Sequence, residues 1–160
     1  MERLDPRRLD LARLRATRLS GVAAWLPTIV RVAAGVFFVS ASTGKFFDYA
    51  KEVDDFRRFE VPIPEIAVPM AGVVELIGGI LLIVGLLTRP ASLALLANMV
   101  VALATAGRVE GGSFHLVYPP ILIAATGFLL WAGPGRRSVD ACMAARRAAP
   151  GSLPAGPVSA

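Results

Sequence analysis

The stretch that decides the fold is residues 66–87, IAVPMAGVVELIGGILLIVGLL, which carries a single charged residue, Glu75. About 20 helical residues, each rising about 1.5 Å, cross the hydrocarbon core of a bilayer, so this stretch is long enough for one crossing. Three further stretches have the same apolar character and share one charged residue, Arg31: residues 22–44, 90–107 and 114–132. The sequence therefore predicts four transmembrane helices.

The overall composition supports this interpretation. The chain has 160 residues, of which 55% are hydrophobic, whereas soluble domains average about 45–50% apolar residues even when glycine is counted. We expect an all-α protein whose four-helix membrane bundle covers residues 22–133, which leaves too little chain for a separate soluble domain. Pro119 and Pro120 should kink the fourth helix or delay its start. The expected helices are 22–46, 66–87, 90–108 and 114–133.

The charges outside these helices are divided unevenly between the two sides of the membrane. The side with both termini and the tight turn at Arg89 carries eleven basic and four acidic residues, and the other side carries five and seven. By the positive-inside rule, this division predicts cytoplasmic termini (N-in/C-in) in a multi-pass protein of a bacterial cytoplasmic (inner) membrane. The rule also accounts for the net charge of +5, so we expect no nucleic-acid partner.

The two terminal segments differ in composition from the bundle. Residues 1–21 are rich in arginine and leucine, which suits a cytoplasmic arm that rests on anionic lipid headgroups or serves only as a topology signal. Residues 134–160 are expected to form a cytoplasmic tail, disordered from about residue 150, where Pro, Gly, Ser and Ala dominate.

Ionisable and amide side chains inside a bilayer are costly, which makes them candidates for function. We expect Arg31, Glu75 and Asn98 to form a polar cluster, because helix rise puts Arg31 and Asn98 level and Glu75 only about 8 Å from Arg31 along the membrane normal. Such a cluster is either a clamp that holds the bundle together or a site for a substrate or proton. The outer end of the bundle adds three candidates: Ser42, Lys45 and His115. Five glycines are expected to let helices pack closely: Gly35, Gly72, Gly78, Gly79 and Gly85.

The scarcity of some residue types excludes several kinds of site. With Cys142 as the only cysteine and His115 as the only histidine, the chain cannot by itself perform thiol–disulfide exchange, ligate haem through two histidines or form a histidine-rich metal site. We therefore expect no metal site and no intrinsic cofactor. Redox chemistry here would depend on a lipid-soluble quinone or on a partner protein.

Five short motifs follow one another through the predicted bundle. They are Arg31-x-x-x-Gly35-x-x-Phe38, Thr43-Gly44-Lys45-Phe46, Val74-Glu75-Leu76-Ile77-Gly78-Gly79, Gly85-Leu86-Leu87-Thr88-Arg89 and Asn98-Met99-Val100-Val101-Ala102. Each motif is weak alone, but their order and spacing are specific. From about Val30 to Asp140 the chain resembles the DoxX family of small four-helix inner-membrane proteins.

The resemblance implies a small membrane subunit that anchors or supports an oxidoreductase or respiratory complex. Our hypothesis adds a quinone-facing pocket among its first three helices. Some DoxX members act in oxidoreductase systems, whereas more distant relatives resemble assembly factors without enzyme activity. A non-enzymatic scaffold or assembly factor is therefore the alternative function, and a small transporter is a weaker one. We expect the lipid bilayer and other protein subunits as partners, and no independent catalytic activity. The resemblance assigns no catalytic residue.

Overall fold

In the computed structural model, the described residues are 18–19, 21–135 and 137–148, and every regular element among them is helical. In chain order these elements are η1 (Gly21–Trp25), α2 (Leu26–Phe47), α3 (Tyr49–Arg58), α4 (Pro64–Val84), α5 (Thr88–Ala102), the π-helix η2 (Leu103–Gly107), α6 (Gly112–Ala132) and α7 (Val139–Ala148).

Four helical spans in the described residues are long and apolar enough to cross a membrane: Val22–Phe47, Pro64–Val84, Thr88–Gly107 and His115–Ala132. The prediction of an all-α, four-helix membrane fold is confirmed. The orientation with both termini in the cytoplasm stays a prediction. The expectations for residues 1–17 and 149–160 lie outside the described residues.

Helices α2 and α4 are in direct backbone contact. A Cβ atom added to Gly35 would lie 2.7 Å from the carbonyl oxygen of Gly79, and one added to Gly79 would lie 2.9 Å from the carbonyl oxygen of Gly35. Both distances are too short for real side chains, so only glycine permits this approach. Closer to α3, a Cβ atom on Gly72 would meet the Lys45 Cβ at 3.1 Å. Glycines on both helices therefore set their separation.

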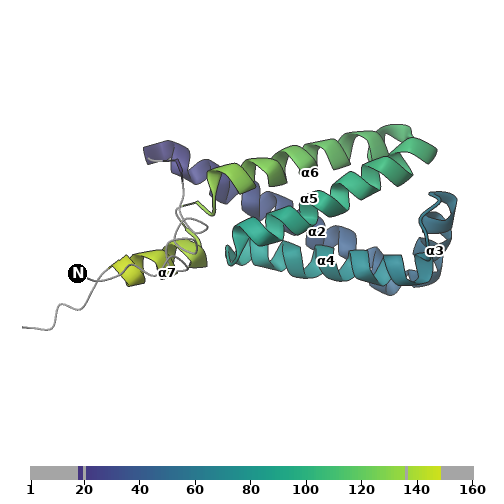
Figure 1. Cartoon of the computed structure of the whole chain (residues 1–160), viewed down its shortest axis with the longest axis horizontal. Coiled ribbons are helices and arrows are strands. Elements are labelled where there is room, and N and C mark those ends of the chain that lie inside the picture. Colours follow the sequence, from purple (N-terminus) through teal and green to yellow (C-terminus); the bar gives the residue numbers. More distant parts are fainter. Residues whose placement is uncertain (1–17, 20, 136, 149–160) are drawn as a thin grey trace, which may run out of the picture.

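The second pair, α5 and α6, diverges from the first along the bundle (Figure 1). Near α7, the pairs meet in an apolar core that includes Phe38, Leu82, Leu95 and Leu129. There Gly78 of α4 lies against Leu95 of α5, because a Cβ atom on Gly78 would be 2.9 Å from Leu95 Cγ. We call the region where the pairs converge the α7 end, and the opposite region, which α3 crosses, the α3 end.

Helix α6 runs through both of its prolines instead of starting after them. It begins at Gly112, earlier than the prolines would suggest, and continues to Ala132. Prolines at 119 and 120 have no N–H to donate to the carbonyl groups four residues earlier, which belong to His115 and Leu116. The His115 carbonyl oxygen instead lies close to Gly107 of η2, where an added Cβ atom would be 3.2 Å away.

Two short helices occupy segments that we expected to be connection or tail. In α3, Val53 is buried and Phe56 is half-buried three residues later, so one face of this mostly charged helix packs on the bundle. Helix α7 begins after Ser138, whose Oγ accepts a hydrogen bond from the N–H of Ala141 at 3.0 Å. This is the N-cap arrangement that serine favours.

Arg31 does not join Glu75 and Asn98, contrary to the expected cluster. Its side chain is 2% exposed and donates from Nη1 to the carbonyl oxygens of Leu82 (2.6 Å) and Ile83 (3.0 Å), and from Nη2 to that of Arg137 (2.6 Å). The last carbonyl groups of a helix lack intrahelical donors and carry partial negative charge, so they attract a guanidinium. Arg31 therefore binds the C-terminal end of α4.

Asp140 of α7 binds the start of α5 in a complementary way. Its Oδ1 and Oδ2 accept hydrogen bonds from the N–H groups of Leu87 (3.1 Å) and Thr88 (3.0 Å), and the residue is 1% exposed. The Asp140 N–H donates to the Gly85 carbonyl oxygen at 3.0 Å. The turn between α4 and α5 is thus held by Arg31 on one side and Asp140 on the other.

We predict that Gly79→Ala lowers the free energy of unfolding by about 1–3 kcal/mol, because the new methyl group has no room against the α2 backbone. The matched control is Gly127→Ala, where the nearest atom to the added Cβ, Leu96 Cδ1, lies at 3.8 Å. Thermal unfolding of both variants in detergent provides the measurement. Equal stability of the two variants would contradict the packing argument.

We predict that Asp140→Ala costs about 1–2 kcal/mol of stability, because it leaves the N–H groups of Leu87 and Thr88, at the start of α5, without their acceptor. Asp54→Ala is the control, since Asp54 pairs with Arg57 on the exposed face of α3. Denaturant unfolding of the two variants should show a clear loss for the first and a change within about 0.5 kcal/mol for the second.

Candidate functional site

A pocket of about 740 Å³ lies between the two helix pairs at the α3 end. Its lining comes from α2, α3, α4, α5, η2 and α6, and most of the lining side chains are apolar. One wall contains Phe37 of α2 stacked on Tyr118 of α6, with ring centroids 5.5 Å apart. Known small-molecule sites enclose about 300–1,000 Å³ and are mainly apolar with a few polar groups, and this pocket has both properties.

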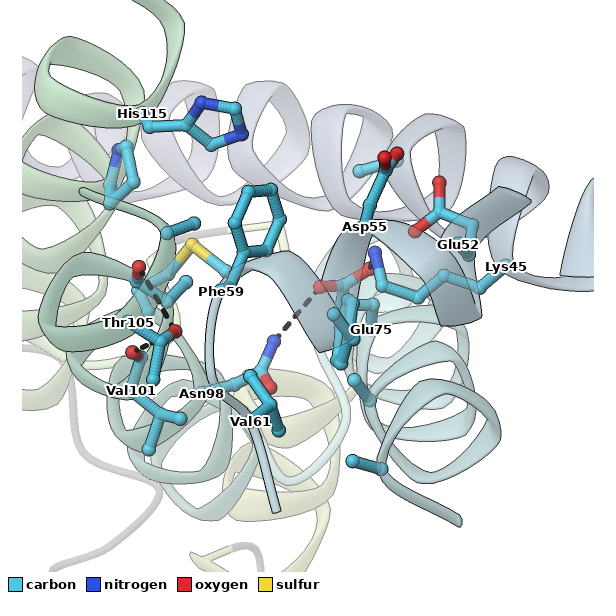
Figure 2. Close-up of a pocket in the computed structure, with 18 of the residues that line it drawn as sticks. Lys45, Glu52, Asp55, Phe59, Val61, Glu75, Asn98, Val101, Thr105 and His115 are labelled. Atoms are coloured by element: carbon cyan, nitrogen blue, oxygen red, sulfur yellow. Dashed lines mark hydrogen bonds and ion pairs between the residues drawn. The ribbon is translucent and has the colours of Figure 1, made fainter. Parts of the chain in front are cut away.

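Three polar side chains meet at the inner part of this pocket (Figure 2). Lys45 Nζ lies 2.8 Å from Glu75 Oε2, and Asn98 Nδ2 donates to Glu75 Oε1 at 2.9 Å. Glu75 is 4% exposed, so its carboxylate is almost completely removed from solvent. The Lys45 ammonium and the Asn98 amide offset the cost of burying this charge. We call these three residues the Glu75 trio.

The trio connects three helices, and the close approach of α2 and α4 makes it possible. Lys45 lies beside Gly72, one helical turn from Glu75, and its long apolar stem spans that turn. Asn98 of α5 then links the α2–α4 pair to the α5–α6 pair. The structure thus brings together two residues of the expected cluster, Glu75 and Asn98, and adds Lys45, which we had assigned to the outer end.

The remaining outer-end candidates have different positions. Ser42 is buried and donates its hydroxyl to the Val39 carbonyl oxygen of its own helix at 2.8 Å, outside the pocket lining. His115 lines the pocket, with its Nδ1 3.5 Å from Glu110 Oε2 and its ring 5.3 Å from that of Phe59. His115 and Lys45 therefore belong to the pocket, whereas Ser42 belongs to α2.

The charged residues of α3 are part of the site that sequence reasoning missed. Their side chains line the pocket on the side of α3: Lys51, Glu52, Asp55 and Arg58. On the opposite, exposed face, Arg57 donates to Glu65 at the start of α4, and this hydrogen bond raises the pKa of the Arg57 guanidinium. The alternation of Val53 and Phe56 with charged residues was the signal for an amphipathic helix here.

The arrangement can bind a partly polar small molecule. Lys45 Nζ carries three N–H donors and Asn98 Nδ2 carries two, and the bonds to Glu75 use one from each group. In the described part of the chain, no group of three or more His, Cys, Asp or Glu side chains could hold a metal ion. The Glu75 trio itself offers hydrogen-bond donors and a carboxylate that can accept or release a proton.

Comparison with known proteins supports the family that the order of the sequence motifs indicated. The DoxX family model matches residues 26–108, which include the Glu75 trio. The chain is also similar to an uncharacterized membrane protein of Mycobacterium tuberculosis, at 33% identity over 77% of this chain and 84% of the relative. No solved structure matches the chain. The chain is thus an integral membrane protein that belongs to the DoxX family.

Proposed function

We propose that the protein is a small membrane subunit that supports an oxidoreductase complex and binds a lipid-soluble quinone in the pocket. The observation that carries the proposal is the Glu75 trio at the inner part of a mainly apolar pocket among the membrane-spanning helices. A quinone has an apolar ring with two carbonyl oxygens, which need hydrogen-bond donors when they leave water.

The trio suits a quinone carbonyl because its donors and its carboxylate are adjacent. Lys45 and Asn98 both bind Glu75 and both line the pocket, so a carbonyl oxygen near them would also lie near the carboxylate. Reduction of a quinone to a quinol adds two electrons and two protons, with one proton on each oxygen. Glu75 would pass protons to or from the bound oxygen as a general acid or base.

The electrons would come from the redox centre of a partner subunit. Cys142 is the only cysteine of the chain, so a dithiol within one subunit cannot supply them. This requirement is why we propose a subunit of a complex and not an independent enzyme. His115 and Glu110, 3.5 Å apart at the pocket, would exchange protons with the aqueous side at the α3 end.

A non-enzymatic scaffold is the second candidate, and the docking of α7 favours it. The buried Asp140 and the Arg31 bond to the Arg137 carbonyl hold residues 137–140 against the bundle, which creates a fixed surface at the α7 end. If the protein is a scaffold, substitutions of Glu75 should affect its function only by lowering the stability of the bundle. The first of the following two experiments separates these candidates, and the second tests the ion pair of the Glu75 trio.

We predict that Glu75→Gln lowers quinone-linked turnover of the purified complex by about 100-fold, because glutamine keeps the size of the side chain and one acceptor oxygen but cannot transfer the proton. Binding of the quinone to the subunit should change by only a few-fold. Glu65→Gln is the control, since Glu65 lies on the same helix with an exposed side chain. Absence of quinone binding by the wild-type protein, together with full turnover in Glu75→Gln, would leave the scaffold as the function.

We predict that Lys45→Met lowers the free energy of unfolding by about 3 kcal/mol or more, because it leaves the Glu75 carboxylate buried without its cation. The double variant Lys45→Met/Glu75→Met should regain most of this stability, since no lone charge is then buried. Denaturant unfolding in detergent measures both. A double variant as unstable as the single one would show that the ion pair contributes more than charge compensation.

A further inference from the structure

We infer that the pocket opens sideways, between α4 and α5 at the α3 end, through a portal framed by Met70 and Val101. The ligand would be a long-chain amphiphile that enters from the lipid phase and leaves its apolar chain in the portal. The identity of the ligand's head group, a quinone ring, rests on the proposed function. The portal itself has a separate test that needs no quinone.

Helices α4 and α5 separate at a defined point. They are in contact at Gly78 and Leu95, and the Glu75–Asn98 hydrogen bond of 2.9 Å lies one turn further toward the α3 end. Beyond this bond, residues of both helices and of η2 line the pocket: Met70 and Ala71 of α4, Val101 of α5 and Thr105 of η2. Figure 1 shows the corresponding divergence of the two ribbons.

Met70 and Val101 both line the pocket and reach the surface of the bundle. Met70 is 63% exposed and Val101 is 55% exposed, although each also forms part of the pocket wall. Both residues lie within helical spans apolar enough to cross a membrane, so lipid chains would cover this surface. A pocket that reaches the surface between these side chains is continuous with the hydrocarbon phase.

The other route into the pocket is unsuited to an apolar chain. At the α3 end, Phe59 packs edge-on against the His115 ring with centroids 5.3 Å apart, and the charged side chains of α3 surround the opening. An alkyl or isoprenoid chain would lose favourable burial among those charges. We therefore assign the exchange of small polar species, such as protons, to the route beside the charged side chains of α3, and we assign the ligand's apolar chain to the portal between α4 and α5.

The distance from the Glu75 trio to the portal limits how much of a ligand fits inside the pocket. Glu75 and Met70 are five residues apart, which is about 8 Å along the helix axis. This distance accommodates one ring held at Lys45 and Asn98, and a substituent longer than a few carbon atoms must then leave through the portal. The pocket should consequently bind a head group with a long chain more tightly than the same head group alone.

The first test compares two quinone probes in detergent-solubilised protein. Decylubiquinone carries a ten-carbon chain, and a benzoquinone with the same ring substituents and no such chain serves as the short probe. The expected result is that Met70→Trp and Val101→Trp weaken decylubiquinone binding by about tenfold and change binding of the short probe by less than about twofold.

The matched controls are Val73→Trp and Val100→Trp. These residues are 45% and 46% exposed on the same two helices, and neither lines the pocket. They should leave the binding of both probes unchanged. Equal effects of the portal and control variants, or no effect of the portal variants, would overturn the portal while leaving a quinone site intact.

The second test does not depend on a quinone. A photoreactive long-chain alcohol is dissolved in phosphatidylcholine vesicles that contain the protein, and the labelled residues are identified by mass spectrometry. We expect labelling of the partly buried wall residues Val74 and Ala102, with loss of this labelling in Met70→Trp but not in Val73→Trp. Labelling confined to exposed residues would overturn the portal, whereas wall labelling without quinone binding would overturn only the proposed head group.

Discussion

The backbone contact between Gly35 and Gly79 is the constraint on which the rest of the structure depends. Because each carbonyl oxygen lies close to the place where the other residue would carry a Cβ atom, α2 and α4 approach more closely than any other residue at these two positions would allow. This separation brings Lys45 beside Gly72 and within 2.8 Å of the Glu75 carboxylate. A wider pair would leave that carboxylate buried in an apolar medium without a cation, which costs several kcal/mol.

The two charges that interrupt the predicted spans are compensated in different ways. Glu75 is paired with a full positive charge and an amide, and it faces a pocket. Arg31 is bound by backbone carbonyl groups at a helix C-terminus, which carry partial negative charge, and the Asp140 carboxylate also attracts it electrostatically. The groups that compensate Glu75 line a pocket and keep further hydrogen-bond donors. The donors of Arg31 instead connect α2 to the end of α4 and to Arg137. The type of a buried charged residue therefore does not show whether it belongs to a binding site or stabilises the fold.

The four spans and the glycine-rich helix faces could be predicted because both depend on local pattern: length, apolar content and the spacing of small residues. The pairing of charges could not be predicted, since it depends on how helices shift and how far side chains reach. Helix rise alone separates Lys45 from Glu75 by about 12 Å along the normal, yet the lysine stem and the offset of α4 close this gap. The roles of α3 and Asp140 were missed because ten-residue polar helices resemble connections when hydropathy is the guide.

Pro119 and Pro120 make the bundle mechanically uneven. Helix α6 lacks two backbone N–H donors beside the pocket, and the neighbouring η2 is wound as a π-helix, so this half of the α5–α6 pair has fewer regular hydrogen bonds to resist bending. The α7 end, in contrast, is clamped by Arg31 and Asp140. We therefore expect the α3 end to bend more easily than the α7 end, which would let the pocket change its width while the packed core stays in place.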